Sequence, residues 1–195
     1  MPRPRGIDDD VLLDHVAATI TDSGVAGLTL QSVADRAGVS AATLINRFGS
    51  KRGMLVALDR RWAESVDAEV DHALTAESDP VRRVRATALV WIGDLEAPAV
   101  LANVLSGLAA DLLDTELREL LAAGWGALRR RLTELVADCH RAGRLVGSPP
   151  AEQAARMLFA LAEGTRLAWS VQPEGSLRAR AEADLDALLA GWDQR

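Results

Sequence analysis

Apolar side chains recur at intervals of three and four residues along most of the chain, which is the period of a helix with one buried face. This pattern predicts about nine helices, over residues 8–23, 30–37, 41–48, 51–75, 80–95, 99–108, 115–142, 151–171 and 177–192. No segment shows the apolar–polar alternation of a half-buried strand. The chain is therefore predicted to be all-α.

Glycine and proline mark the ends of several predicted helices. Gly24 is expected to end the first helix and Gly143 the seventh. Pro80 and Pro98 each stand where a helix is expected to open. The Gly-Ser-Pro-Pro segment at 147–150 separates the seventh predicted helix from the eighth.

Two short helices joined by a tight turn are predicted by the stretch LTLQSVADRAGVSAATLINRFGSKRGML. Thr29 and Ser40 stand where a hydroxyl group caps the first and the second of these helices. Gly38 supplies the left-handed backbone that the turn requires. Ala34 is small where the second helix crosses, and Leu44 fills the wedge between the two helices. The pattern is typical of a helix-turn-helix, whose second helix enters a DNA major groove.

The same stretch resembles the N-terminal DNA-binding domain of the TetR family of one-component transcriptional regulators. The resemblance covers about residues 8–61 and rests on Ser40-x-x-Thr43-Leu44, Phe48-Gly49-Ser50-Lys51 and Met54-Leu55. Two positions depart from the family pattern. Ile45 stands where the family usually has Tyr, and Arg52-Gly53 follows Lys51 where the family favours an acidic residue. The alternative is an ordinary helical hairpin with a coincidental glycine.

The resemblance implies a helix-turn-helix domain at 1–55 and a ligand-binding and dimerisation domain at 56–195. The segment at 144–173 also resembles the family's last-but-one helix. In the family the last two helices pair with those of a second copy. The residues expected at such an interface here are Ala155, Ala162, Gly164, Leu185 and Leu189. Alternatively, these two helices only close the core of the monomer.

Contacts with the groove are expected from the side of the second helix that points away from Leu44 and Phe48. Arg47 can pair with guanine, and Asn46 can pair with adenine. The remaining expected contacts, to thymine methyl groups, to phosphates or at the tip of the helix, come from Thr29, Gln31, Ser40, Ala41, Ala42, Thr43, Ile45 and Lys51. By resemblance, Ile45 replaces a Tyr whose hydroxyl often reaches a phosphate. For each residue the alternative is a solvated surface position.

Charge supports a nucleic-acid partner only locally. The formal net charge is −6, but the stretch from Arg36 to Arg61 carries six basic residues against Asp59 alone, a local charge of +5. From Trp62 onward the chain has 14 basic and 21 acidic residues. A basic patch on an acidic body suits a protein that touches nucleic acid at one end.

Cysteine usage and hydropathy indicate a cytoplasmic protein without membrane association. The chain has one cysteine, Cys139, so no internal disulfide framework is predicted. The N-terminus lacks the apolar segment of a secretion signal, and no apolar run is long enough to cross a bilayer.

No catalytic constellation is predicted. The three histidines, His15, His72 and His140, are scattered and none has metal-ligand spacing. The chain has neither a Gly-rich phosphate loop nor a nucleophile elbow. We therefore expect no enzyme activity, no metal and no cofactor.

The resemblance implies a small-molecule effector inside the C-terminal domain. Candidate lining residues are Trp62, Trp91, Asn103, Trp125 and Met157, for each of which plain core packing is the alternative. By this resemblance, the chain is expected to be a homodimeric repressor that leaves a palindromic operator when an effector tilts the fourth helix. The alternatives are a helical enzyme or carrier with an incidental helix-turn-helix, and a DNA binder without an effector.

Overall fold

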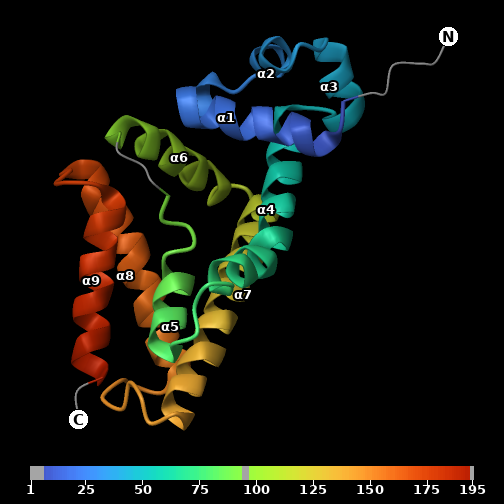
Figure 1. The fold of residues 1–195 in the computed structure, drawn as a ribbon. Helices are drawn as coiled ribbons and strands as arrows, with labels where there is room; N and C mark the ends of the chain where they lie inside the picture. Colours follow the sequence, from blue (N-terminus) through green and yellow to red (C-terminus); the bar gives the residue numbers. More distant parts are fainter. Residues whose placement is uncertain (1–6, 94–96, 194–195) are drawn as a thin grey trace. The chain divides into compact units, whose positions relative to one another are not determined.

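The computed structural model describes residues 7–93 and 97–193 (Figure 1). Within these ranges it contains α1 (Asp9–Gly27), α2 (Leu30–Ala37), α3 (Ala41–Phe48), α4 (Lys51–Leu74), α5 (Pro80–Ala88), α6 (Pro98–Asp111), α7 (Thr115–Arg141), α8 (Ala151–Val171) and α9 (Leu177–Asp193). No strand forms in the described ranges, so the all-α prediction is confirmed. The predicted limits of α2, α3 and α8 match the observed limits.

Three helices end at least three residues away from the predicted limit, and one of them is α6, which ends at Asp111 instead of Leu108. The chain kinks at Gly24 (φ 66°, ψ 178°), but helical structure resumes and α1 continues to Gly27. The prediction of a helix through Trp91 is wrong, because α5 ends at Ala88 and the chain continues in turns. Leu89 and Ile92 lie in this non-helical segment and are buried. Apolar residues at helical spacing therefore continue beyond the end of α5. The last residue of that prediction, Leu95, lies outside the described residues.

The chain divides into two compact units. The first comprises residues 1–62 and 100–121, and the second comprises residues 63–99 and 122–195. The contacts therefore group α6 and the first turns of α7 with the N-terminal helices, and they divide α4 seven residues after the sequence-based limit at 55. The assignment of 1–55 to DNA binding and of 56–195 to ligand binding and dimerisation stays a prediction.

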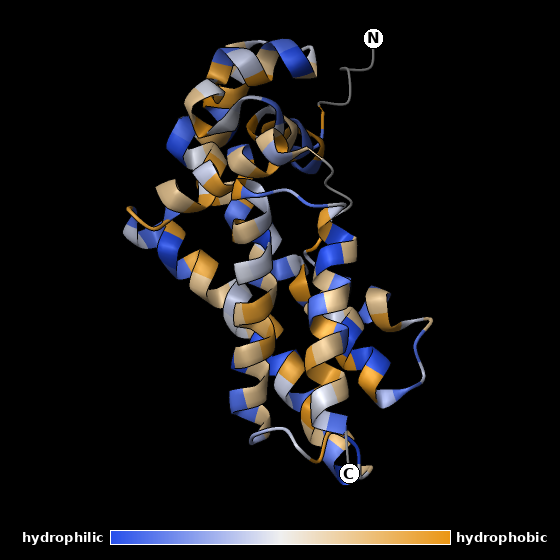
Figure 2. Cartoon of the chain, turned by 90° about the vertical axis from the view of Figure 1, so that its left-hand side faces the viewer, coloured by the Kyte–Doolittle hydropathy of each residue, from blue (hydrophilic) through white to orange (hydrophobic). Residues whose placement is uncertain are grey.

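The core of the first unit is built from apolar residues at helical spacing. Its fully buried members include Leu12, Val16, Leu28, Val33, Ala34, Leu44 and Met54. Figure 2 shows apolar and polar residues interleaved along the helices, as expected when each helix has one buried stripe. Burial of one large aliphatic side chain stabilises a fold by roughly 1.5–3 kcal/mol, so these contacts are the main force that holds α1 to α4 together.

Side chains of α6 satisfy backbone groups that the kink in α1 leaves without helical partners. The side-chain amide of Asn103 donates to the carbonyl oxygen of Thr21 at 3.0 Å. The hydroxyl of Ser106 accepts from the N–H of Val25 at 3.2 Å. Because an unpaired buried backbone group is costly, these two bonds stabilise the broken turn at Gly24.

The second unit is closed at one end by an arginine clamp. The guanidinium of Arg144 binds Asp193 at 2.6 Å and Asp79 at 3.2 Å. Asp79 is also the N-cap of α5, and Asp193 accepts from the N–H of Leu145 at 2.9 Å. The clamp therefore ties the end of α9 to the start of α5 and to the chain after α7.

The first unit partly buries two carboxyl groups, and this burial shifts the pKa of each. Burial, aided by the charge of Asp111, raises the pKa of Asp59 to about 7. Burial, aided by the charge of Asp114, raises the pKa of Asp111 to about 6. The Oδ2 atom of Asp59 makes no hydrogen bond among the described residues. By contrast, hydrogen bonds from Arg52 help to lower the pKa of Asp114 to about 2.

We predict that Asp59 makes the fold less stable as the pH rises. Its folded-state pKa exceeds the unfolded value of 3.8, so the folded chain binds the proton more tightly and the free energy of unfolding falls between about pH 4 and pH 7. Asp59→Asn should therefore stabilise the protein by on the order of 1 kcal/mol near pH 8 and by little near pH 5, since the group is partly solvated. Urea unfolding at the two pH values measures this, with Asp35→Asn as the exposed control. An equal gain at both pH values would contradict the prediction.

Candidate nucleic-acid interface

Local hydrogen bonds form the turn between α2 and α3 as the sequence predicted. Thr29 caps α2 by accepting from the N–H of Ser32 at 2.9 Å. Ser40 caps α3 by accepting from the N–H of Thr43 at 3.2 Å. Gly38 adopts the left-handed conformation (φ 66°, ψ 29°), which a residue with a Cβ atom rarely adopts. The predicted caps and turn are confirmed.

Burial of Leu44 determines which side of α3 points outward. Leu44 has no exposed surface, and Phe48 packs partly buried against the same core. With 3.6 residues per turn, the opposite side of α3 carries Ala42 and Asn46, and both are exposed. Ile45 lies at one border of this surface with 49 % of its area exposed. We call this set (Ala42, Thr43, Ile45, Asn46) the outer face of α3.

Arg47 lies at the other border of the outer face and already has partners. Its guanidinium forms an ion pair with Asp9 in the first turn of α1. A second nitrogen of the same guanidinium donates to the carbonyl oxygen of Ile7 at 3.3 Å. The structure therefore places Arg47 beside α1, one residue beyond the exposed Asn46.

The other predicted DNA contacts lie in the same unit, and several also have structural roles. The hydroxyls of Ser40 and Thr43 are 2.9 Å apart, while Ala41, the first residue of α3, packs partly buried against the core. Gln31 donates to Asp35 at 2.6 Å. The ammonium of Lys51 donates to the carbonyl oxygen of Val25. Their roles toward DNA stay predictions.

The departure from the family pattern after Lys51, at Arg52 and Gly53, has physical reasons that the sequence did not reveal. A Cβ atom on Gly53 would lie 1.8 Å from the carbonyl oxygen of Phe48, so the close approach of α4 to the end of α3 requires glycine. The guanidinium of Arg52 binds Asp114 at 2.7 Å and Glu116 at 3.0 Å. An acidic residue in place of Arg52 would repel both carboxylates. The opposite charges are visible in the sequence, but a separation of 62 residues hides their contact.

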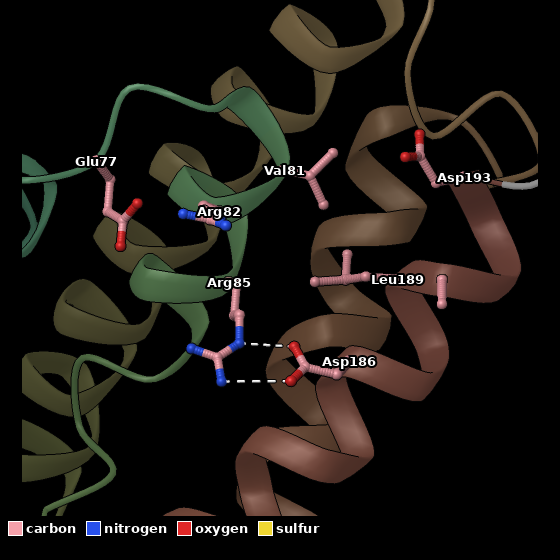
Figure 3. A pocket seen from close by; sticks show the side chains of 8 residues that line it. Glu77, Val81, Arg82, Arg85, Asp186, Leu189 and Asp193 are labelled. Atoms are coloured by element: carbon pink, nitrogen blue, oxygen red, sulfur yellow. Dashed lines mark hydrogen bonds and ion pairs between the residues drawn. The ribbon is translucent and has the colours of Figure 1, made fainter.

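Among the described residues of the second unit, two open pockets are large enough for a small molecule. One, of about 530 Å³, is lined by Glu77, Val81, Arg82, Arg85, Asp186, Leu189, Ala190 and Asp193 (Figure 3). Arg85 lies at its edge with Asp186, which it binds at 2.6 Å. The other, of about 630 Å³, is lined by Ser65, Ala68, Glu69, His72, Ala73, Glu77, Arg85, Ala86, Leu89, Val90 and Arg178. Their volumes are within the range of ordinary ligand sites.

The predicted effector residues do not line either of these cavities. Trp62 and Asn103 belong to the first unit, where Asn103 supports the kink in α1. Trp125 packs edge-to-face against Phe159, with ring centroids 5.2 Å apart. Met157 is 41 % exposed on α8. Trp91 is partly buried in the turn after α5. Helical periodicity predicts which apolar residues are buried, but not which of them line a pocket. Nothing in the sequence distinguished the charged lining residues from other surface charges.

Most of the residues predicted at a dimer interface are buried inside the chain itself. Ala155, Ala162, Leu185 and Leu189 have at most 5 % of their surface exposed, so they pack within the second unit rather than facing a partner. Gly164 differs, because a Cβ atom there would meet no atom within 4 Å. The structure thus corrects the choice of residues, while the interface itself stays a prediction.

The described ranges, residues 7–93 and 97–193, contain neither a membrane-spanning helix nor a cluster of metal ligands. No helix there combines the length and the apolar composition needed to cross a membrane. No group of three or more His, Cys, Asp or Glu residues there is placed to hold a metal ion.

An all-helical chain whose capped helix-turn-helix presents an exposed second helix defines a DNA-binding regulator. Two family models agree with that class. Residues 12–58 match the model described as bacterial regulatory proteins, tetR family, and residues 80–192 match that of the BetI-type transcriptional repressor, C-terminal. The chain belongs to the TetR family of bacterial transcriptional regulators, which is not a family of enzymes.

Known relatives and solved structures are similar over most of their length. The HTH-type transcriptional regulator BetI of Burkholderia ambifaria (strain MC40-6) is 30% identical over 159 residues, which are 78% of this chain and 77% of the relative. A putative transcriptional regulator from Saccharomonospora viridis in complex with choline has a TM-score of 0.78 at 18% identity, covering 93% of this chain and 95% of that one. FadR from Bacillus subtilis in complex with stearoyl-CoA has a TM-score of 0.72 at 16% identity, covering 94% and 99%. At these identities the two structures show the shared fold alone.

Because Ile45 is half exposed, we predict that its side chain can be enlarged without disturbing the core. Ile45→Tyr adds a hydroxyl that can donate to a phosphate, and should tighten binding to a recognised duplex by about 1 kcal/mol with unchanged sequence preference. Ile45→Ala should weaken binding, again with little change in preference. Titration of each variant on a bound duplex and on its scrambled counterpart at fixed salt measures both effects. Strong loss of binding by Ile45→Tyr would mean that Ile45 packs in the complex instead of facing the backbone.

Proposed function

We propose that the protein is a homodimeric repressor that binds a near-palindromic operator and leaves it when a small molecule occupies the second unit. One observation carries the proposal: the capped, exposed outer face of α3 lies directly opposite the fully buried Leu44. Two copies of α3 related by a two-fold axis can read two half-sites in successive major grooves. Such a regulator acts in the cytoplasm, where the chromosome is.

Continuity of α4 supports a link between ligand and DNA. Residues 51–62 of this helix belong to the first unit and residues 63–74 to the second. A ligand that favours another position of the second half of α4 also moves the first half, where Lys51 lies beside the helix-turn-helix. Ligand and operator then weaken each other's binding by the same factor.

The cavity of about 630 Å³ is our candidate effector site. Ala68, Ala73, Ala86, Leu89 and Val90 give it an apolar floor, while its other lining residues are polar or charged. Choline, which the Saccharomonospora viridis protein binds, is a natural first ligand to test. However, a quaternary ammonium group is usually held by a cage of Trp, Tyr or Phe, and none of the lining residues is one of these. We therefore expect an effector with an apolar body and a hydrogen-bonding head group.

An exposed apolar stripe on α8 supports dimerisation. Met157, Ala160, Gly164, Leu167 and Val171 follow one another at alternating spacings of three and four residues, and all five are exposed. Leu167 is 58 % exposed and Val171 is 80 % exposed, which is unusual for such residues unless a partner covers them. This spacing is that of a helix seam that packs on a second helix.

Selection of bound duplexes from a random DNA pool tests the proposal. We expect a site with two inverted half-sites about one helical turn apart, from which a small molecule releases the protein. Choline and stearoyl-CoA would be the first ligands added, followed by a metabolite collection. Enrichment of no duplex at low salt would contradict the DNA-binding proposal. An enriched operator that no ligand releases would instead favour a DNA binder without an effector.

We predict that a bulky side chain at position 164 separates the dimer without unfolding the chain. The space around a Cβ atom on Gly164 is open within the chain, so Gly164→Leu should leave helicity and unfolding largely unchanged. If α8 forms the dimer seam, the same change should raise the dimer dissociation constant by at least about tenfold, since it clashes with the partner. Sedimentation measures the dimer, and Gly126→Leu on α7, where the space is also open, is the matched control. An unchanged dimer would place the interface elsewhere.

A further inference from the structure

Every basic side chain in the stretch from Arg36 to Arg61 forms an ion pair or a hydrogen bond within the chain. The ion pairs and hydrogen bonds are Arg36–Asp22, Arg47–Asp9, Lys51–Val25 O, Arg52–Asp114, Arg60–Glu116 and Arg61–Asp14. Over its described residues the first unit has seven basic and eleven acidic side chains. The basic side chains of the unit that is proposed to bind DNA are therefore largely neutralised by acidic side chains of the same unit.

Among these pairs, Arg47–Asp9 is the one that borders the outer face of α3. Arg47 follows Asn46 directly and lies one helical turn beyond Thr43, so a phosphate at the groove edge is within the reach of its long side chain. Asp9 and the carbonyl oxygen of Ile7 accept from two different nitrogens of the guanidinium. These are the donors that a bidentate contact with phosphate uses.

We propose that Asp9 is an internal counterion that competes with DNA phosphate for Arg47 and so lowers the affinity for DNA and its dependence on salt. This inference rests on the proposed DNA binding. Both side chains of the pair are partly solvated, at 38 % and 52 % exposed, so a phosphate can displace the carboxylate. Displacing the carboxylate costs the free energy of the Arg47–Asp9 pair. Where Arg47 keeps Asp9 instead, the pair contributes no net charge to the complex. In either case Asp9 opposes binding.

The test measures binding to a mixed-sequence duplex of about 30 base pairs over a range of salt concentrations, so it does not depend on knowing the operator. Asp9→Asn keeps the shape of the side chain and removes its charge. It should tighten binding by about twofold to tenfold and steepen the slope of log K against log salt by just under one. Circular dichroism checks that α1, which begins at Asp9, stays folded.

Two further variants make the result specific to Arg47. In the Arg47→Ala background, Asp9→Asn should change neither affinity nor slope, because no guanidinium is left for Asp9 and the phosphate to compete for. Glu119→Gln removes one negative charge from an exposed position on α7 of the same unit and should have little effect. Equal tightening by Asp9→Asn in both backgrounds would overturn the inference in favour of a general charge effect.

The remaining outcomes separate this inference from the proposed function. If the wild type binds the duplex and Asp9→Asn leaves affinity and slope unchanged, the inference fails while the DNA-binding proposal stands. If Asp9→Asn weakens binding, Asp9 orients Arg47 toward DNA, and competition is again refuted. If the wild type binds no duplex even at low salt, the proposed function fails and the inference fails with it.

Discussion

The full burial of Leu44 is the contact on which the candidate interface depends. A helix of eight residues is too short to hold its orientation by itself, so α3 is fixed by the core that it enters. Loss of a buried leucine side chain costs about 2–5 kcal/mol, more than the ion pairs and caps around it contribute. Once Leu44 points inward, Asn46 must point outward and Arg47 must lie beside α1. The orientation of the candidate DNA contacts on α3 therefore follows from one apolar contact.

Charge in the first unit shows why a local count of residues misleads. The stretch from 36 to 61 carries +5 in sequence, yet its five arginines are bound by acids from α1 and from the start of α7, and Lys51 is bound by the carbonyl oxygen of Val25. Surface ion pairs of this kind contribute little to stability. These ion pairs matter more for DNA binding, because a phosphate has to displace the carboxylate before it can pair with the arginine. Asp9 and Asp10, which the helix dipole of α1 favours, are two of these carboxylates.

The sequence predicted well what depends on neighbours along the chain. The caps Thr29 and Ser40 and the turn at Gly38 lie within a few residues of the groups that they serve, so their roles were visible. The continuation of α1 beyond Gly24 was not visible, because it depends on Asn103 and Ser106, some 80 residues away. Periodicity found the apolar residues of α8 and α9. It did not show that Ala155 and Leu185 pack inside the chain, whereas Leu167 and Val171 on α8 are exposed.

The contacts around the first half of α4 indicate how a movement of this helix would reach DNA. Lys51 donates to the carbonyl oxygen of Val25 near the end of α1, and Arg52 forms an ion pair with Asp114. Met54 is buried in the core of the same unit. A tilt of α4 therefore carries the helix-turn-helix with it as one body, since bending it would break these contacts together. The turn at Gly38 and the burial of Leu44 stay intact during such a tilt. In a dimer, the consequence is a changed distance between two unaltered recognition helices. Release of the operator then requires no unfolding of the surface that reads it.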